Sequence, residues 1–153
     1  MTLAEQLIAV ALVGLLAAAG LWNGSQTLAR QRLEAATAAL GLGLERARSA
    51  AERTGQPCLL VLGSRGWQAP AAGGCGEGAG PLLEGGDGDG LSLSHNLPGP
   101  LTFTANGLVL GGGTVVLGME GTALRRCLVV SLPLGITRVG RQEGSGCQAD
   151  DAL

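Results

Sequence analysis

The chain begins with an unbroken apolar run, which gives way to a one-sided pattern of apolar and charged positions. Residues 7–22 carry no charged side chain. With residues 1–6 added, this run reaches the length of a helix that crosses a bilayer, about 20 residues. Residues 26–53 contain no proline, and apolar side chains recur there every three to five positions. These side chains include Leu28, Leu33, Ala36, Leu40 and Leu44. The spacing predicts an amphipathic helix that continues the apolar one.

The two patterns together predict one long helix with two functional parts, residues 1–25 and residues 26–54. The apolar part must be surrounded by lipid or by other helices. We expect the helix to bend or unwind within residues 14–24, because Gly14, Gly20 and Gly24 each cost about 1 kcal/mol relative to Ala. Pro57 predicts its end, since the residue before a proline is pushed out of the α region.

After Pro57 the pattern changes to short apolar runs separated by Gly and Pro, which predicts antiparallel strands. The runs are residues 58–63, 91–95, 101–104, 107–111, 114–118 and 127–132. The clearest hairpin spans residues 101–111, where Asn106 and Gly107 are expected to supply the positive φ angles of a tight turn. A small sheet packed on the helix gives an α+β fold, with residues 55–153 as a β-rich globular domain.

Two further features complete this picture of the domain. Residues 73–90 are too rich in Gly to form a strand and predict an exposed loop, tethered at Cys75. Trp67 is expected to pack in the core beneath that loop. His95 is the only histidine, and no Ser or Cys stands near it in a pattern typical of nucleophilic catalysis. We therefore expect a structural or exposed histidine and a protein that is not an enzyme and holds no cofactor.

Cys58, Cys75, Cys127 and Cys147 all follow the apolar run, and none forms a CxxC pair. Zinc sites favour such close pairs, so we expect disulfides in an oxidising compartment outside the cytoplasm. Four cysteines permit three pairings, of which pairing between sequence neighbours is the most plausible. Each of those two disulfides closes a loop of about 20 residues, worth roughly 3 kcal/mol in the chain-entropy model.

Glu5 stands before the apolar run, where a cleavable secretory signal would carry positive charge. A carboxylate within an apolar helix costs about 2.5 to 3.5 kcal/mol or more unless a cation accompanies it. Either Glu5 lies at the headgroup level of a simple membrane anchor, or a partner neutralises it. We favour a partner.

Met1-Thr2-Leu3-Ala4-Glu5, followed by the apolar run, resembles the start of mature type IV pilins and pseudopilins, which typically read Phe-Thr-Leu-x-Glu. The resemblance implies that a prepilin peptidase exposes and N-methylates the amine of Met1, and that Glu5 pairs with this amine on a neighbouring subunit. It also implies other pilin subunits and an inner-membrane assembly platform as partners. The chain would be held in lipid by a single-pass helix in the bacterial inner membrane, and then move into an extracellular filament.

The carboxy-terminal part resembles minor subunits of the GspH/FimT type, in which a long helix leads into two small sheets. There a Val-Val-Ser-like strand end is followed by Gly-Arg-x-Arg. Residues 128–131 match the strand, Ile136 replaces the first Arg and Arg138 matches the second. This resemblance implies a structural, minor subunit of a type II secretion pseudopilus or a type IV pilus.

The alternative function is a DNA-binding or adhesive minor pilin of a DNA-uptake system, as proposed for some FimT-like proteins. Arg138 and Arg141, with Arg125 and Arg126, would then form a phosphate-binding patch. The net charge of −2 and pI of about 5.3 give no general attraction to nucleic acid, and Glu143, Asp150 and Asp151 lie nearby. We favour a solvated strand edge.

Acidic residues of the Gly-rich stretch raise one further question, that of calcium binding. Glu84, Asp87 and Asp89 could offer oxygen ligands, but the remaining EF-hand spacing is missing. A flexible turn and no metal site are therefore the favoured interpretation.

Overall fold

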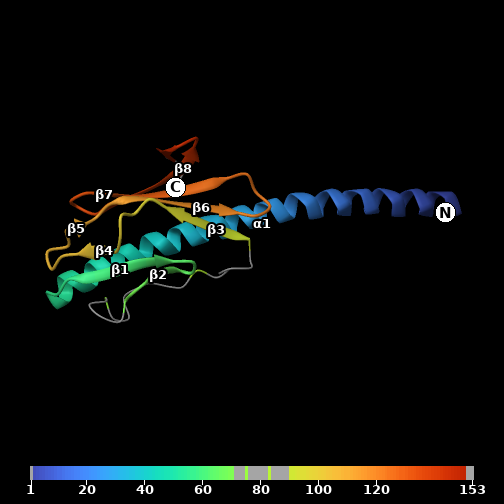
Figure 1. Ribbon diagram of the computed structural model, residues 1–153. Coiled ribbons are helices and arrows are strands. Elements are labelled where there is room, and N and C mark those ends of the chain that lie inside the picture. The colour runs from blue at the N-terminus through green and yellow to red at the C-terminus, as the bar shows by residue number, and fades with distance from the viewer. Residues whose placement is uncertain (1, 71–74, 76–82, 84–89, 151–153) are drawn as a thin grey trace.

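A computed structural model describes residues 2–70, 75, 83 and 90–150, and for residues 19–23 it describes the backbone alone. One long helix, α1 (Leu3–Thr54), runs from the amino terminus past the whole β-rich part (Figure 1). It ends where Gly55 adopts a φ of +63°, two residues before Pro57, so its predicted end is confirmed. Every residue of α1 is helical, so of the two outcomes expected within residues 14–24, a bend or an unwound segment, the unwound segment does not occur.

The second half of α1 buries one apolar stripe against the sheets. Its members follow one another at steps of three and four, which places them on one face of a helix. They are Ala29, Leu33, Ala36, Leu40, Leu44, Ala47 and Ala51. Leu28, which the pattern assigned to this stripe, is 49% exposed. Leu28 and Leu33 are five residues apart, and a step of five residues rotates a side chain by about 140° beyond a full turn of the helix. The two side chains therefore cannot share the buried face.

Two antiparallel sheets lie along this stripe, and the predicted α+β class is confirmed (Figure 1). The four-stranded sheet has the order β2-β1-β4-β5. Its strands are β1 (Cys58–Gly63), β2 (Gly66–Gln68), β4 (Leu101–Phe103) and β5 (Val109–Leu110). The five-stranded sheet has the order β3-β6-β7-β8-β9. Its strands are β3 (Leu91–His95), β6 (Gly113–Met119), β7 (Arg125–Ser131), β8 (Ile136–Glu143) and β9 (Gly146–Ala149).

The core lies between the helix and the inner faces of both sheets. Alternate residues of the central strands point into it, as the period of two requires. The most buried of these side chains are Leu60, Leu101, Phe103, Val115, Leu117 and Leu128. One core therefore joins both sheets to α1, and the helix cannot leave its place without exposing it.

Trp67 lies in this core, as predicted, with 2% of its surface exposed. Its indole Nε1 donates a hydrogen bond to the backbone oxygen of Leu40, at 2.9 Å. Leu83 is also buried, and its N–H bonds to the oxygen of Arg65 at 3.0 Å. The prediction of an exposed stretch over residues 73–90 is thus wrong at Leu83. Glu84, Asp87 and Asp89 lie outside the described residues.

The predicted hairpin over residues 101–111 is present, but its turn differs from the one expected. Thr104 O accepts the N–H of Gly107 at 2.9 Å, and Thr104 N–H donates to Leu108 O at 2.8 Å. Only Gly107 has a positive φ, of +73°, while Asn106 does not. This is a type I turn closed by a glycine in the left-handed region, which needs one positive φ rather than two.

Three strands were not predicted from the sequence: β2, β8 and β9. β2 and β9 are short, and five of the eight residues of β8 are polar or charged. The apolar signal of β8 and β9 is weak because their residues, apart from Gly140, are exposed or only half-buried. Backbone pairing with β7, to which β8 is joined by a short turn, holds β8 in the sheet instead.

Both disulfides join sequence neighbours, as predicted: Cys58 with Cys75, and Cys127 with Cys147. The second links β7 to β9 across the intervening strand, β8. In β8, Gly140 pairs with Cys127 on one side and with Ala149 on the other. A side chain at this position would overlap the carbonyl oxygen of Gln148 and lie 3.2 Å from the sulfur of Cys147. The bridge therefore requires a glycine beneath it.

Gly140→Ala should therefore destabilise the domain. The added methyl meets backbone, which cannot move aside as a flexible side chain can, so we expect a loss of about 1–3 kcal/mol in the free energy of unfolding. Thermal unfolding of the full chain in detergent measures the change. Gly99→Ala is the matched control, because nothing lies within 4 Å of its added methyl. Equal midpoints for the two variants would contradict this account of Gly140.

Candidate assembly interface

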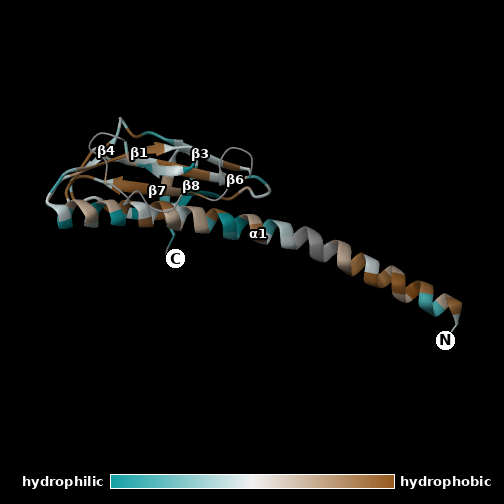
Figure 2. Cartoon of the chain, turned by 90° about the horizontal axis from the view of Figure 1, so that it is seen from below, coloured by the Kyte–Doolittle hydropathy of each residue, from teal (hydrophilic) through white to brown (hydrophobic). Residues whose placement is uncertain are grey.

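The first half of α1 projects away from the sheets, and its first turns are apolar apart from Glu5 and Gln6 (Figure 2). Large aliphatic side chains there are between 56% and 76% exposed. They are Leu3, Leu7, Ile8, Val10, Leu12, Val13, Leu15 and Leu16. The predicted transmembrane helix is not supported: in the described part of the chain, no helix is long and apolar enough to cross a membrane.

Glu5 lies in the first turn of this projecting helix and caps it. Thr2 is the N-cap residue, and its backbone N–H donates to Oε2 of Glu5 at 2.7 Å. The sequence Thr-x-x-Glu is the signature of a capping box, so this role was readable from the sequence but was missed. The negative side chain also favours the positive end of the helix dipole.

Met1 lies outside the described residues, so its amine and any contact with Glu5 remain a prediction. Glu5 itself is exposed. Within one chain, its described hydrogen bond satisfies the backbone of Thr2. That bond places a carboxylate at the very start of an apolar surface.

An ion-pair network ties α1 to the five-stranded sheet. The guanidinium of Arg126, on β7, lies 2.8 Å from Oε1 of Glu34 on α1, and it also bonds to Asp150 just after β9. Arg126 is only 5% exposed, while its two partners are partly accessible. The network therefore joins three segments that are far apart in the sequence.

The charge of Arg126 depends on these two carboxylates. Burial lowers the pKa of Arg126, but hydrogen bonds to Glu34 and Asp150 and their negative charge outweigh burial, so the pKa is raised. Arg126 thus stays charged at every physiological pH. Because it is buried in this network, Arg126 cannot contribute to a DNA-binding patch.

Arg138 and Arg141 are not brought together by the fold. Both lie on β8, which pairs with β7 in regular register, and residues three apart in a strand point to opposite faces. Arg141 faces the side of Arg126, with its Nη2 3.7 Å from Oδ2 of Asp150. Arg138 faces the opposite side of the sheet, the side of Cys127. β8 is an interior strand along Gly140–Glu143, where β9 covers it. The two arginines therefore do not form one phosphate-binding surface.

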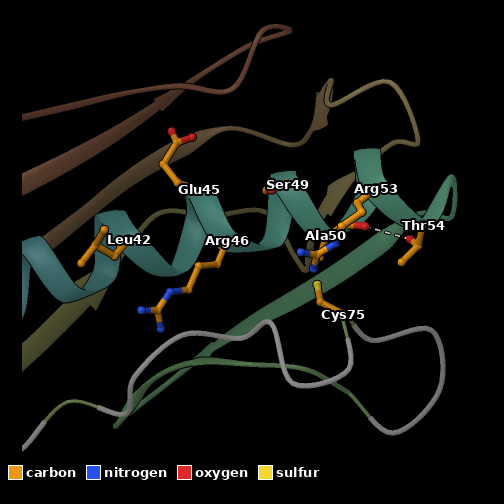
Figure 3. A pocket seen from close by; sticks show the side chains of 8 residues that line it. All are labelled: Leu42, Glu45, Arg46, Ser49, Ala50, Arg53, Thr54 and Cys75. Carbon is orange, nitrogen blue, oxygen red and sulfur yellow. Dashed lines mark hydrogen bonds between the residues drawn. The ribbon is translucent and has the colours of Figure 1, made fainter.

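A groove of about 490 Å³ runs along the outer side of α1, bounded by Cys75 (Figure 3). Its charged lining residues are Glu45, Arg46 and Arg53. Within the described ranges, no three potential metal ligands gather into a site. His95 is exposed at the end of β3. None of these features assembles a catalytic set.

Comparison with known families then decides the kind of protein. The model of the family described as "Type II transport protein GspH" matches residues 36–134, well over half of the chain. The chain belongs to the GspH family. The matched region begins within the buried half of α1 and ends after β7. No curated protein and no solved structure matches the chain.

Membership makes this GspH-family chain a pseudopilin of a type II secretion or pilus-like system, with other pseudopilin subunits as its partners. Pseudopilins of this family are structural and belong to a membrane-associated pseudopilus. Glu5, Arg138 and Arg141 lie outside the matched residues.

In this GspH-family chain, Arg126→Met should loosen the attachment of α1 to the sheet. The methionine fills similar space but leaves Glu34 and Asp150 without their shared cation, so we expect a loss of about 1–3 kcal/mol. Denaturant unfolding of the full chain in detergent measures it. Arg138→Met, on the opposite face of the same sheet, should change stability by less than about 0.5 kcal/mol. A similar loss in both variants would contradict the role assigned to the network.

Proposed function

We propose that this chain is a minor pseudopilin that assembles into a filament through the projecting half of α1. One observation carries the proposal: the first part of the helix is uncovered and apolar, whereas the second part is buried against a GspH-family domain. Residues 1–25 would form the filament core, residues 26–54 the helical support, and residues 55–153 the outer domain. The function is structural, without catalysis.

The exposed aliphatic surface supports this division. A continuous apolar surface of this size marks a site of protein or membrane contact, because its exposure to water is unfavourable. Helices of neighbouring subunits can cover it in the filament. Before assembly, inner-membrane lipid covers it, and a prepilin peptidase and an assembly platform act on the chain there. After assembly, the outer domain lies outside the membrane.

Glu5 gives the proposed assembly its axial register. Once water is excluded, its carboxylate needs a cation, since an uncompensated charge in apolar surroundings is costly. The free amine of Met1 on a neighbouring subunit is a cation at the same end of an identical or related helix. Pairing the two fixes how far one subunit is displaced along its neighbour.

Glu5→Gln separates the capping role from the charge. Glutamine can still accept the N–H of Thr2 and keep the capping box, but it carries no charge to pair with an amine. We therefore expect normal helix content and at least about a tenfold drop in the subunit recovered in sheared, pelleted filaments, equivalent to about 1.4 kcal/mol.

Glu45→Gln provides the matched control for that experiment. Glu45 is exposed on the same helix and makes no described ion pair, so its variant should assemble normally. Glu5→Ala should fail like Glu5→Gln. Normal filament incorporation of Glu5→Gln would rule out charge pairing and leave Glu5 as a helix cap.

The amino terminus of the native protein offers a second test. If a prepilin peptidase processes the chain, mass spectrometry of the terminal peptide should show Met1 as the first residue with a methyl group on its amine. Deleting the peptidase should abolish that peptide. A formyl group on Met1, or a longer terminal peptide in the wild-type strain, would oppose this processing step.

A further inference from the structure

Two arginines stand where α1 passes from its projecting half to the part that the sheets cover. Residues 6–29 carry no charged side chain, so Arg30 and Arg32 are the first charged residues after Glu5. Both are exposed, and neither has an ion pair among the described residues. The long uncharged stretch therefore ends in two cations that no described side chain neutralises.

The outer domain begins at the same level of the helix. Ala29 is the first residue of the stripe that is buried against the sheets. A side chain added at Gly121, in the turn between β6 and β7, would meet Ala29 at 3.7 Å. Glu120 and Arg125, which flank this turn, are exposed and opposite in charge. Among the described residues at this end of the domain, the net positive charge therefore comes from α1.

The side chains of Arg30 and Arg32 leave the helix on two different sides. A step of two residues turns an α-helix by about 200°, so the two arginines lie on either side of Ala29. The Cα–Cβ bonds of a helix tilt toward its amino terminus, so both side chains lean toward the projecting half. Their guanidinium groups can therefore reach the same level from two sides of α1.

That level matches the headgroup layer of a bilayer whose lipid covers the projecting half. Trp22 closes the apolar run, and eight steps of 1.5 Å place Arg30 roughly 12 Å beyond it. The polar layer on each side of the hydrocarbon core is about 5–7 Å thick. A long arginine side chain that leans back along the helix can span the remaining distance.

A lipid phosphate suits these two side chains chemically. The planar guanidinium presents paired N–H donors that match the oxygens of a phosphate. In a zwitterionic lipid the phosphate is accompanied by the lipid's own ammonium group, whereas in an anionic lipid it carries net charge. Arginines close to an anionic surface are attracted to it, and salt screens this attraction.

We propose that Arg30 and Arg32 bind the headgroup phosphates of anionic phospholipids and so set the depth of the subunit in the membrane before assembly. This inference rests on the proposed function, in which lipid covers the projecting half of α1. It gives the uncharged stretch a charged residue at each end, Glu5 at its start and the arginine pair at the domain. A subunit that enters a filament must then release these headgroups.

Fluorescence quenching in vesicles tests the proposal. The full chain is placed in vesicles made of equal parts phosphatidylcholine and phosphatidylglycerol, with bromine on the acyl chains of one lipid or of the other. Trp22 lies in the projecting half and reports the lipids around it, whereas Trp67 is buried in the domain and gives a constant background. We expect phosphatidylglycerol to be preferred over phosphatidylcholine around Trp22 by about three- to fivefold.

Variants of matched charge separate the two arginines from the rest of the helix. Arg30→Gln/Arg32→Gln should lower the preference to about one. Arg46→Gln/Arg53→Gln is the control, because it removes the same charge from exposed positions of α1. Arg46 lies roughly 21 Å beyond Arg32, which is about two Debye lengths at physiological salt, so the control should keep the wild-type preference. Added NaCl should weaken the preference wherever Arg30 and Arg32 are present.

The same measurements can overturn the proposal. Equal quenching by the two brominated lipids in the wild type, or the same preference in both double variants, would do so while leaving lipid cover of the helix in place. An Arg30→Gln/Arg32→Gln variant that keeps its anionic lipids but is lost from filaments would also do so, because the arginines would then contact neighbouring subunits. No quenching by either lipid would oppose the lipid cover itself, and with it the proposed function.

Discussion

The burial of one helical stripe, from Ala29 to Ala51, holds the two sheets in a single domain. Alanine occupies four of its seven positions and leucine the other three. The small residues let the strands approach the helix closely, and Leu33, Leu40 and Leu44 fill the space between. Strands from both sheets share this surface, so neither sheet has a core without α1. The Nε1 bond of Trp67 to Leu40 and the guanidinium of Arg126 beside Glu34 add polar anchors on the same element.

This arrangement divides one helix between two environments. From Ala29 onward, the apolar stripe is narrow because the sheets cover only one side of α1. Before that residue no strand of the described chain covers α1, and between Leu7 and Leu16 exposed aliphatic side chains surround the helix. A helix that is apolar on all sides is stable only where lipid or other helices enclose it. Because both parts belong to one continuous helix, the position of the projecting part fixes the position of the domain.

The local pattern of apolar, proline and cysteine residues was sufficient to predict much of the fold. Pro57 and the apolar runs predicted the end of α1 and the bounds of β1 and β3, and the neighbouring cysteines predicted both disulfides. Long-range contacts were not predictable in this way. In the sequence, Arg125 and Arg126 look like two adjacent surface arginines. Arg126 is nevertheless two and four residues from Leu128 and Val130, and this even spacing places it on the inner face of β7. Its partners lie 92 and 24 residues away, so no local signal reveals the ion pairs.

The capping role of Glu5 adds a constraint on how an assembly contact can form. Its carboxylate already accepts the N–H of Thr2, which fixes the side chain along the first turn of α1. In the proposed assembly, an incoming amine would meet an oriented carboxylate and would not need to order a free side chain, which lowers the entropic cost of pairing. A carboxylate can accept several hydrogen bonds, so cap and ion pair do not compete. The same residue can thus define where the helix begins and where the next subunit stops.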